Sequence, residues 1–168
     1  DQAYSFVSLL NSQILFIEKL RMPAKYQGKF KPQNPLKYKG DPGNIFYRSG
    51  WELKLMFKLD HNPNVIWWRS EEIALPYRSP VDGKIHRYFP DFVVHLKNKE
   101  GKLETLMIEV KPKNQTQEPK KQDKVTKKYL NEVFTWGVNQ AKWKSAEEYC
   151  KDRGWRFCLF TEKELGIV

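Results

Sequence analysis

The sequence predicts a single mixed α/β domain, in which helices flank a central mixed sheet that contains an antiparallel meander of three strands. At 168 residues, the chain is long enough for one hydrophobic core and short for two ordinary domains. Apolar residues recur at helical spacing before residue 60 and again after residue 125, and strand-like runs lie between those regions. The expected order is therefore a helix, three strands, a helix and a final strand.

The first 43 residues are predicted to precede this core as two extensions. Residues 1–22 are assigned an amphipathic helix that packs on the core or on a partner, because apolar residues recur there at helical spacing. These residues are Phe6, Leu9, Leu10, Ile14 and Ile17. Residues 23–43 collect prolines and glycines among lysines, which predicts an irregular basic arm along DNA phosphates or a solvated linker. The core is assigned to residues 44–168.

The core is predicted to begin with a helix from Ser49 to about Asp60, ended by the turn residues 61–64. Three strands follow it. The first combines residues 65–68 and 72–77, the second covers 87–96, and the third covers 103–110. Turn residues at 79–83 and 98–101 separate the three strands, which predicts that neighbours pair in antiparallel fashion.

The C-terminal third is predicted to contain a long helix and a buried strand. The helix covers about residues 125–152, with a candidate break at Gly137 and an end at Gly154. Residues 155–160 form an almost continuous apolar run, which is typical of a strand buried on both faces. Thr161 with Glu164 predicts a capping box for a last helical turn.

Charge and composition indicate a nucleic-acid partner. Lys and Arg outnumber Asp and Glu by 30 to 20, and a surplus of this size favours a polyanion, because neutralised phosphates release condensed counterions. No membrane association is expected, since residues 1–20 lack a basic leader and polar residues interrupt their apolar stretch. Cys150 and Cys158 fit a reduced cytoplasmic setting and do not form a zinc-site pattern with the three histidines.

The second and third predicted strands bring two acidic residues together. If Asn98 pairs with Lys102 across a three-residue loop, Asp91 stands directly opposite Glu109. Like charges in that position destabilise a sheet unless a cation lies between them, and a divalent metal would reverse the penalty. Lys111 projects from the same face as Glu109 because side chains alternate along a strand. A register shifted by one residue would place the two acids on opposite faces.

These residues resemble a known signature. Pro90-Asp91 followed by Glu109-Val110-Lys111, on apolar strands, resembles the motif of the PD-(D/E)-x-K nucleases. The resemblance implies a restriction-endonuclease-like core in which Asp91, Glu109 and the Val110 carbonyl bind one or two Mg²⁺ ions, with Mn²⁺ as a substitute. The metal would polarise the scissile phosphate and acidify a water, and Lys111 would orient the nucleophile or stabilise the developing charge. The alternative is that Asp91 pairs with Arg87 or Lys111, and Glu109 with Lys111 or Lys113.

Two further residues are assigned to the site by the same resemblance. Glu52 would be a catalytic and metal-binding acid, because the family often carries an acid on the helix before the sheet. The alternative is a capping box in which Glu52 accepts the amide of Ser49 and takes no part in chemistry. Gln140 resembles an accessory glutamine of some branches that touches the metal-bound water or phosphate; the alternative is a solvated helix residue.

Basic residues around the motif are the candidate DNA contacts. They are Arg48, Arg87, Lys113, Lys120, Lys121 and Lys124. Each would neutralise a backbone phosphate, and the alternative for each is a solvated surface charge. His86, Arg87 and Tyr88, immediately before the motif, are candidates to enter a DNA groove or clamp the backbone; the alternative is a turn flank, which would show the same polar mixture.

Longer strings resemble the head-completion nucleases of large tailed phages over roughly residues 29–113. The strings are Tyr47 to Leu53, Asn62 to Val65, Ser70 to Glu72 and His86 to Phe92. The order of acid, helix and sheet and the ending at Phe160 to Glu164 also resemble TnsA-type transposon endonucleases. The implied function is a Mg²⁺-dependent endodeoxyribonuclease that trims DNA at the packaged head before tail attachment.

The resemblance also implies partners and a location. DNA is the expected substrate, phage head and portal proteins are candidate partners, and symmetric double-strand cutting would need a homodimer or two sequential events. The expected location is the cytoplasm, that of the host for a viral protein, or the virion. The alternatives are a TnsA-like, homing or recombination endonuclease, and a non-catalytic DNA-binding virion protein on a nuclease scaffold. The joint presence of Asp91, Glu109 and Lys111 argues against the non-catalytic alternative.

Overall fold

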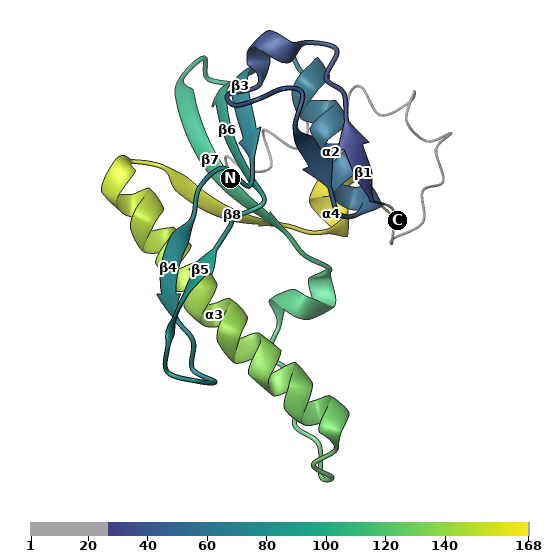
Figure 1. The fold of residues 1–168 in the computed structure, drawn as a ribbon, viewed down its shortest axis with the longest axis vertical. Helices are drawn as coiled ribbons and strands as arrows, with labels where there is room; N and C mark the ends of the chain where they lie inside the picture. Colours follow the sequence, from purple (N-terminus) through teal and green to yellow (C-terminus); the bar gives the residue numbers. More distant parts are fainter. Residues whose placement is uncertain (1–26, 168) are drawn as a thin grey trace.

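A four-stranded mixed sheet forms the centre of the computed structural model, which describes residues 27–167 (Figure 1). Its strand order is β3 (Val65–Ser70), β6 (Phe92–Lys97), β7 (Leu103–Val110) and β8 (Arg156–Phe160). The first three strands pair in antiparallel fashion, and β8 runs parallel to β7. The predicted mixed sheet with its three-strand antiparallel meander is thus confirmed.

Two helices cover the sheet, one on each face. The helix α2 (Gly50–His61) packs with Phe92 and Val94 in one cluster, whereas α3 (Lys127–Arg153) packs with Val93 and Met107 in another. Successive strand residues point to opposite faces, so a run of apolar residues in β6 supplies both layers. The sheet is therefore buried on both sides at β6 and β7, the strands that lead to the predicted motif.

The register of the β6–β7 hairpin agrees with the predicted one. Phe92 pairs with Ile108 and Lys97 with Leu103. At the turn, the Asn98 amide donates to the Lys102 carbonyl at 2.8 Å, and Gly101 adopts a φ of 78°, in the left-handed region that favours glycine. This turn chemistry fixes which residues oppose one another further along the hairpin.

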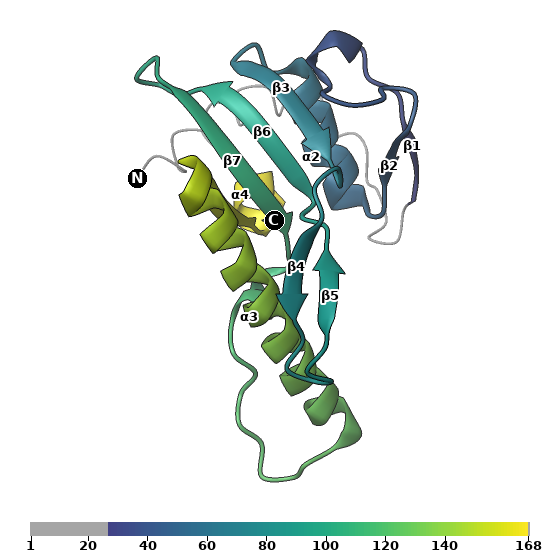
Figure 2. The ribbon, with the colours of Figure 1, turned by 60° about the vertical axis from the view of Figure 1, so that its left-hand side comes forward.

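Two of the predicted strands are each divided in two. Residues 65–77 form β3 and β4 (Leu75–Arg78), and residues 87–96 belong to β5 (Ile85–Tyr88) and β6. The breaks lie at Glu71, whose φ of 52° is left-handed, and at Pro90, which has no amide for a sheet ladder. The strands β4 and β5 pair with each other as a separate hairpin that leaves the sheet and runs along α3 (Figure 2). The prediction was wrong in assigning the segments on either side of each break to one strand.

Residues 27–43, predicted as a basic arm or solvated linker, pack on the core. They contain β1 (Gly28–Phe30), which pairs with β2 (Ile45–Tyr47), and the 3-10 turn η2 (Pro35–Lys37). Phe30 and Tyr38 are buried in the α2-side cluster, because this segment contributes apolar side chains between its prolines. The predicted helix at residues 1–22 lies outside the described residues.

The C-terminal elements differ from their predictions in two respects. The helix α3 continues through Gly137, since a single helical glycine costs only about 1 kcal/mol, and it ends at Gly154 as predicted. β8 is an edge strand and is only partly buried rather than covered on both faces. The predicted capping box of Thr161 and Glu164 is confirmed at α4 (Glu162–Leu165). No helix within residues 27–167 has the length and apolar character needed to cross a membrane.

The fully buried Asp60 carboxylate ties the N-terminal segment to α2. It accepts the backbone amides of Gln33 at 2.8 Å and Asn34 at 3.0 Å. Asp60→Ala leaves both donors without their acceptor, so we expect the free energy of unfolding to fall by about 2–4 kcal/mol in urea denaturation. Asp41→Ala is the control, because that carboxylate accepts the exposed Gly43 amide, and its effect should stay below about 1 kcal/mol. Equal effects of the two variants would contradict this role of Asp60.

Candidate active site

Asp91 and Glu109 meet where β6 begins and β7 ends. Glu109, 6% exposed, is the next-to-last residue of β7, and Asp91 lies in the bend directly before β6. Asp91 Oδ2 accepts the backbone amide of Val110 at 2.7 Å, which fixes the Asp91 carboxylate beside the strand that carries Glu109. The structure therefore brings together the two acids that the hairpin register placed opposite each other.

Lys111 completes the predicted triad of side chains. Its Nζ lies 3.4 Å from Glu109 Oε1, and 26% of its side chain is exposed. Its backbone amide donates to the Phe160 carbonyl at 2.9 Å, so the pairing with β8 extends just beyond the end of β7 and holds Lys111 in strand geometry. The ion pair between Glu109 and Lys111, weighed in the sequence as an alternative to catalysis, is thus present within the triad itself.

Tyr88 is a further residue of the site, which sequence reasoning did not assign to the carboxylates. Its hydroxyl donates to Glu109 Oε2 at 2.7 Å, and the side chain is only 4% exposed. Lys142 of α3 places its Nζ 5.6 Å from the centre of the Tyr88 ring. A buried tyrosine hydroxyl needs a hydrogen-bond partner, and the position of Tyr88 just before the acidic motif was the available signal. Tyr88 holds one oxygen of Glu109 while Lys111 faces the other.

Glu52 takes part in the start of α2, although not through the predicted contact with the Ser49 amide. The Ser49 hydroxyl caps α2 by accepting the Glu52 amide at 3.1 Å, but the Glu52 carboxylate accepts the Arg48 amide at 2.9 Å instead of that of Ser49. The pKa of Glu52 is raised by burial and further by the charges of Glu71 and Glu109, against the Arg48 hydrogen bond that lowers it. Glu52 is therefore both part of the helix start and electrostatically coupled to the acid pair.

Burial and mutual repulsion make the acid pair costly to ionise. Burial raises the pKa of Asp91 well above its usual range, and the charge of Glu109 raises it further, while the Val110 amide and Lys111 act in the opposite direction. Burial also raises the pKa of Glu109, opposed by the Tyr88 hydroxyl and by Lys111. Among residues 27–167, Lys111 is the one cation that forms an ion pair with either acid, and its partner is Glu109. A divalent cation would remove this excess of negative charge.

The available donors fit Mg²⁺. Among residues 27–167, no three His, Cys, Asp or Glu side chains are grouped so that they could hold a metal ion. The donors at this place are the carboxylates of Asp91 and Glu109, with the Val110 carbonyl as the predicted third oxygen. Magnesium sites commonly use one or two carboxylates and complete their octahedron with waters and substrate phosphates, so an oxygen-only set of this size suits the ion.

The other predicted residues lie at varying places around this centre. Arg48 forms a two-pronged pair with Glu71, through Nε at 2.8 Å and Nη2 at 3.0 Å, so its guanidinium is held beside the acids. Arg87 is exposed on β5, 5.8 Å from the ring centre of Phe89. Gln140 is exposed on α3, and no hydrogen bond within residues 27–167 joins it to Asp91 or Glu109.

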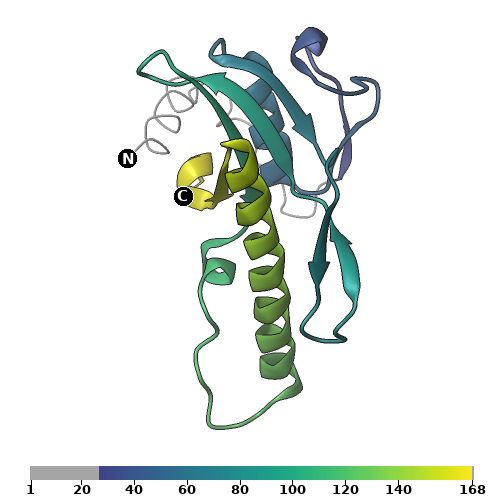
Figure 3. The ribbon, with the colours of Figure 1, turned by 90° about the vertical axis from the view of Figure 1, so that its left-hand side faces the viewer.

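The predicted lysine contacts all follow the motif in the chain. Lys113 begins the 3-10 turn η3 (Lys113–Thr116), and its amide donates to both oxygens of Glu162 at 3.1 Å. Lys120, Lys121 and Lys124 are exposed in the loop that leads to α3. The loop and the β4–β5 hairpin lie on different sides of α3 (Figure 3).

The mixed sheet, with its paired acids and lysine at the end of a β-hairpin, defines a nuclease scaffold of the PD-(D/E)-x-K class with the restriction-endonuclease-like fold. The family model of the TnsA-like endonuclease N-terminal domain matches residues 62–162. The head completion nuclease of Enterobacteria phage T4 is 42% identical over 147 residues, which cover 85% of this chain and 95% of the relative. The chain belongs to this family of TnsA-like and head-completion nucleases. The likeness extends well beyond the residues 29–113 that carried the predicted resemblance.

Asp91→Asn is expected to stabilise the metal-free protein at pH 7. The raised pKa of Asp91 means that the folded protein binds a proton more tightly than the unfolded chain, so stability falls as pH rises from about 4 through the raised value. Each unit of elevation costs about 1.4 kcal/mol above both pKa values. The asparagine keeps an oxygen for the Val110 amide but carries no charge.

Urea denaturation in chelator at several pH values measures this effect. The gain in the free energy of unfolding of Asp91→Asn should disappear below about pH 3, where the wild-type Asp91 carboxyl is protonated in both the folded and the unfolded chain. The exposed Asp152→Asn is the control and should change stability by less than about 0.5 kcal/mol at either pH. A variant less stable than the wild type at pH 7 would show that the acid pair is not repulsive.

Proposed function

We propose that this protein is a Mg²⁺-dependent DNA endonuclease that processes DNA at the head of a tailed phage during head completion. The observation that carries the proposal is the buried pair of Asp91 and Glu109, joined to Lys111, in a chain of the head-completion nuclease family. The T4 relative bears the name of that function, and its similarity covers nearly its whole length. The excess of 30 basic over 20 acidic residues suits a DNA substrate.

The site divides the chemistry among a few groups. Asp91, Glu109 and the Val110 carbonyl would hold Mg²⁺, with Mn²⁺ as a substitute, and Glu52 would reach the same place from α2. The bound metal would polarise the scissile phosphate and lower the pKa of a water. Lys111 keeps its ammonium next to Glu109, where it orients the nucleophile or stabilises negative charge that develops on phosphate. The Tyr88 hydroxyl holds Glu109 in one orientation.

Substrate binding relies on the surrounding basic residues. We assign backbone phosphate contacts to Arg48, Arg87, Lys113 and the loop lysines at 120, 121 and 124. For Arg48 this requires that its guanidinium leave the Glu71 carboxylate and pair with a phosphate, which offers a similar set of acceptor oxygens. Gln140 is assigned an accessory contact to the phosphate. The proposal places the protein in the host cytoplasm or virion, with head and portal proteins as partners and a homodimer for symmetric cutting.

Nicking of supercoiled plasmid in Mg²⁺ tests the activity. We expect cutting by the wild type, none in chelator, and a loss of at least about 100-fold in rate for Asp91→Asn, because the variant loses a metal ligand. Asp152→Asn, an exposed residue at the end of α3, should cut like the wild type. Equal cutting by Asp91→Asn and the wild type would overturn the site. Binding of DNA without cutting would favour a non-catalytic binding protein on this scaffold.

Glu52→Gln separates the catalytic role of Glu52 from its role at the helix start. The amide oxygen of glutamine can still accept the Arg48 amide, so the free energy of unfolding should change by less than about 1 kcal/mol. If Glu52 serves the metal or its water, the cutting rate should fall by roughly 10- to 100-fold. The control is Glu148→Gln on the exposed face of α3. An unchanged cutting rate of Glu52→Gln would contradict the catalytic role and leave Glu52 with its role at the start of α2 only.

A further inference from the structure

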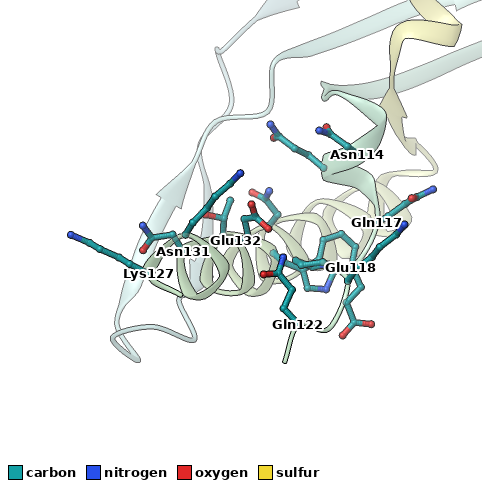
Figure 4. A pocket seen from close by; sticks show the side chains of 14 residues that line it. Asn114, Gln117, Glu118, Gln122, Lys127, Asn131 and Glu132 are labelled. Carbon is teal, nitrogen blue, oxygen red and sulfur yellow. The ribbon is translucent and has the colours of Figure 1, made fainter. Parts of the chain in front are cut away.

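A groove opens between α3 and the loop that follows Lys111. One wall consists of residues 114–122 and the other of residues on α3 between Lys127 and Asn139, and the volume is about 890 Å³ (Figure 4). The first wall begins three residues after Lys111. Sites for small ligands commonly measure about 300–1,000 Å³. A groove of this volume suits an occupant of the size of a small ligand rather than a DNA duplex.

Amide side chains are the most frequent kind among the residues that line the groove. They come from both walls and are Asn114, Gln115, Gln117, Gln122, Asn131 and Asn139. Figure 4 shows the amides of Asn114, Gln117, Gln122 and Asn131 around the opening. Each amide offers a donor and an acceptor side by side, the pattern that pairs with the edge of a nucleobase, adenine above all.

Asn139 adds a largely buried amide to the lining. Its side chain lines the groove on α3 and is only 7% exposed. No side-chain hydrogen bond within residues 27–167 involves this amide, and its polar atoms are not among the fully buried atoms without a partner, so they reach the groove. A polar ligand in the groove would contact them there.

The groove also contains an aromatic ring and a small excess of positive charge. Trp136 lines it, and its indole is held edge-on by Trp143, with ring centres 6.1 Å apart at an interplanar angle of 87°. Such a ring can stack on a base of any identity. The lining lysines at 120, 127 and 128 outnumber the glutamates at 118 and 132, which suits one or two phosphates of a single strand.

We propose that this groove binds an unpaired nucleotide of the DNA substrate beside the point of cleavage. The inference rests on the proposed nuclease function, since the loop that forms the first wall follows Lys111 of the proposed site. Amide edges would contact the base, Trp136 would stack on it, and the lysines would neutralise the adjoining phosphates. The protein would then select DNA that has a single-stranded tail or gap over a blunt duplex.

Binding in chelator, where cutting is blocked, tests the inference. Fluorescence anisotropy would compare a blunt duplex with the same duplex carrying a short tail of unpaired adenines. We expect the wild type to bind the tailed DNA about 10-fold more tightly, a factor within the range of base stacking and amide contacts. The double variant Gln122→Ala/Asn131→Ala should lose this preference and keep its affinity for the blunt duplex. The control Gln27→Ala/Asn44→Ala removes two exposed amides outside the groove and should keep the preference.

A second measurement locates the unpaired base. A 5-iododeoxyuridine in the tail should crosslink to Trp136 on irradiation, and the blunt duplex should give no such product. Equal binding of tailed and blunt DNA by the wild type, or a preference that survives in the groove variant, would overturn the groove assignment. In that event, the proposed nuclease function would be unaffected, because the dependence of plasmid cutting on Mg²⁺ and Asp91 tests it separately. Failure to bind or cut any DNA would overturn the proposed function as well.

Discussion

The hydrogen bond from the Val110 amide to the Asp91 carboxylate is the contact on which the site depends. It joins the end of β7 to the bend that precedes β6, at 2.7 Å, and so places one acid against the strand that carries the other. The bend itself is secured by the Glu71 amide, which donates to the Asp91 carbonyl at 3.2 Å from a left-handed backbone conformation. Strained backbone of this kind persists only where its surroundings hold it in place.

The energetic character of the site follows from that placement. Asp91 and Glu109 are held close together in a largely buried environment. Tyr88 and Lys111 contact the Glu109 carboxylate directly. The folded chain thus stores an electrostatic cost that ligand binding can release. Near the acids, Arg48 joins the start of α2 to Glu71, because its amide donates to Glu52 and its guanidinium forms an ion pair with Glu71.

The sequence predicted those parts of the structure that local chemistry determines. The Asn98–Lys102 turn has a defined loop length, so the register of Asp91 and Glu109 could be worked out by counting along two strands. The break at Pro90 could not be predicted from hydrophobicity, because apolar residues flank it on both sides, and the polar run from Arg69 to Glu72 did not show that the segments around it belong to different sheets. The contact of Tyr88 with Glu109 was missed because the two residues lie far apart in the sequence and only the folded chain brings them together.

The β4–β5 hairpin has a mechanical consequence for the acid that it touches. It leaves the sheet through Glu71 and Pro90, rests on α3 through the hydrogen bond from the Ser145 hydroxyl to the Pro76 carbonyl at 2.8 Å, and ends in Tyr88. Any rotation of the hairpin about its two exit points displaces the phenol from Glu109. The hairpin is therefore a brace: its contact with α3 fixes the position of Tyr88, and Tyr88 in turn orients the Glu109 carboxylate.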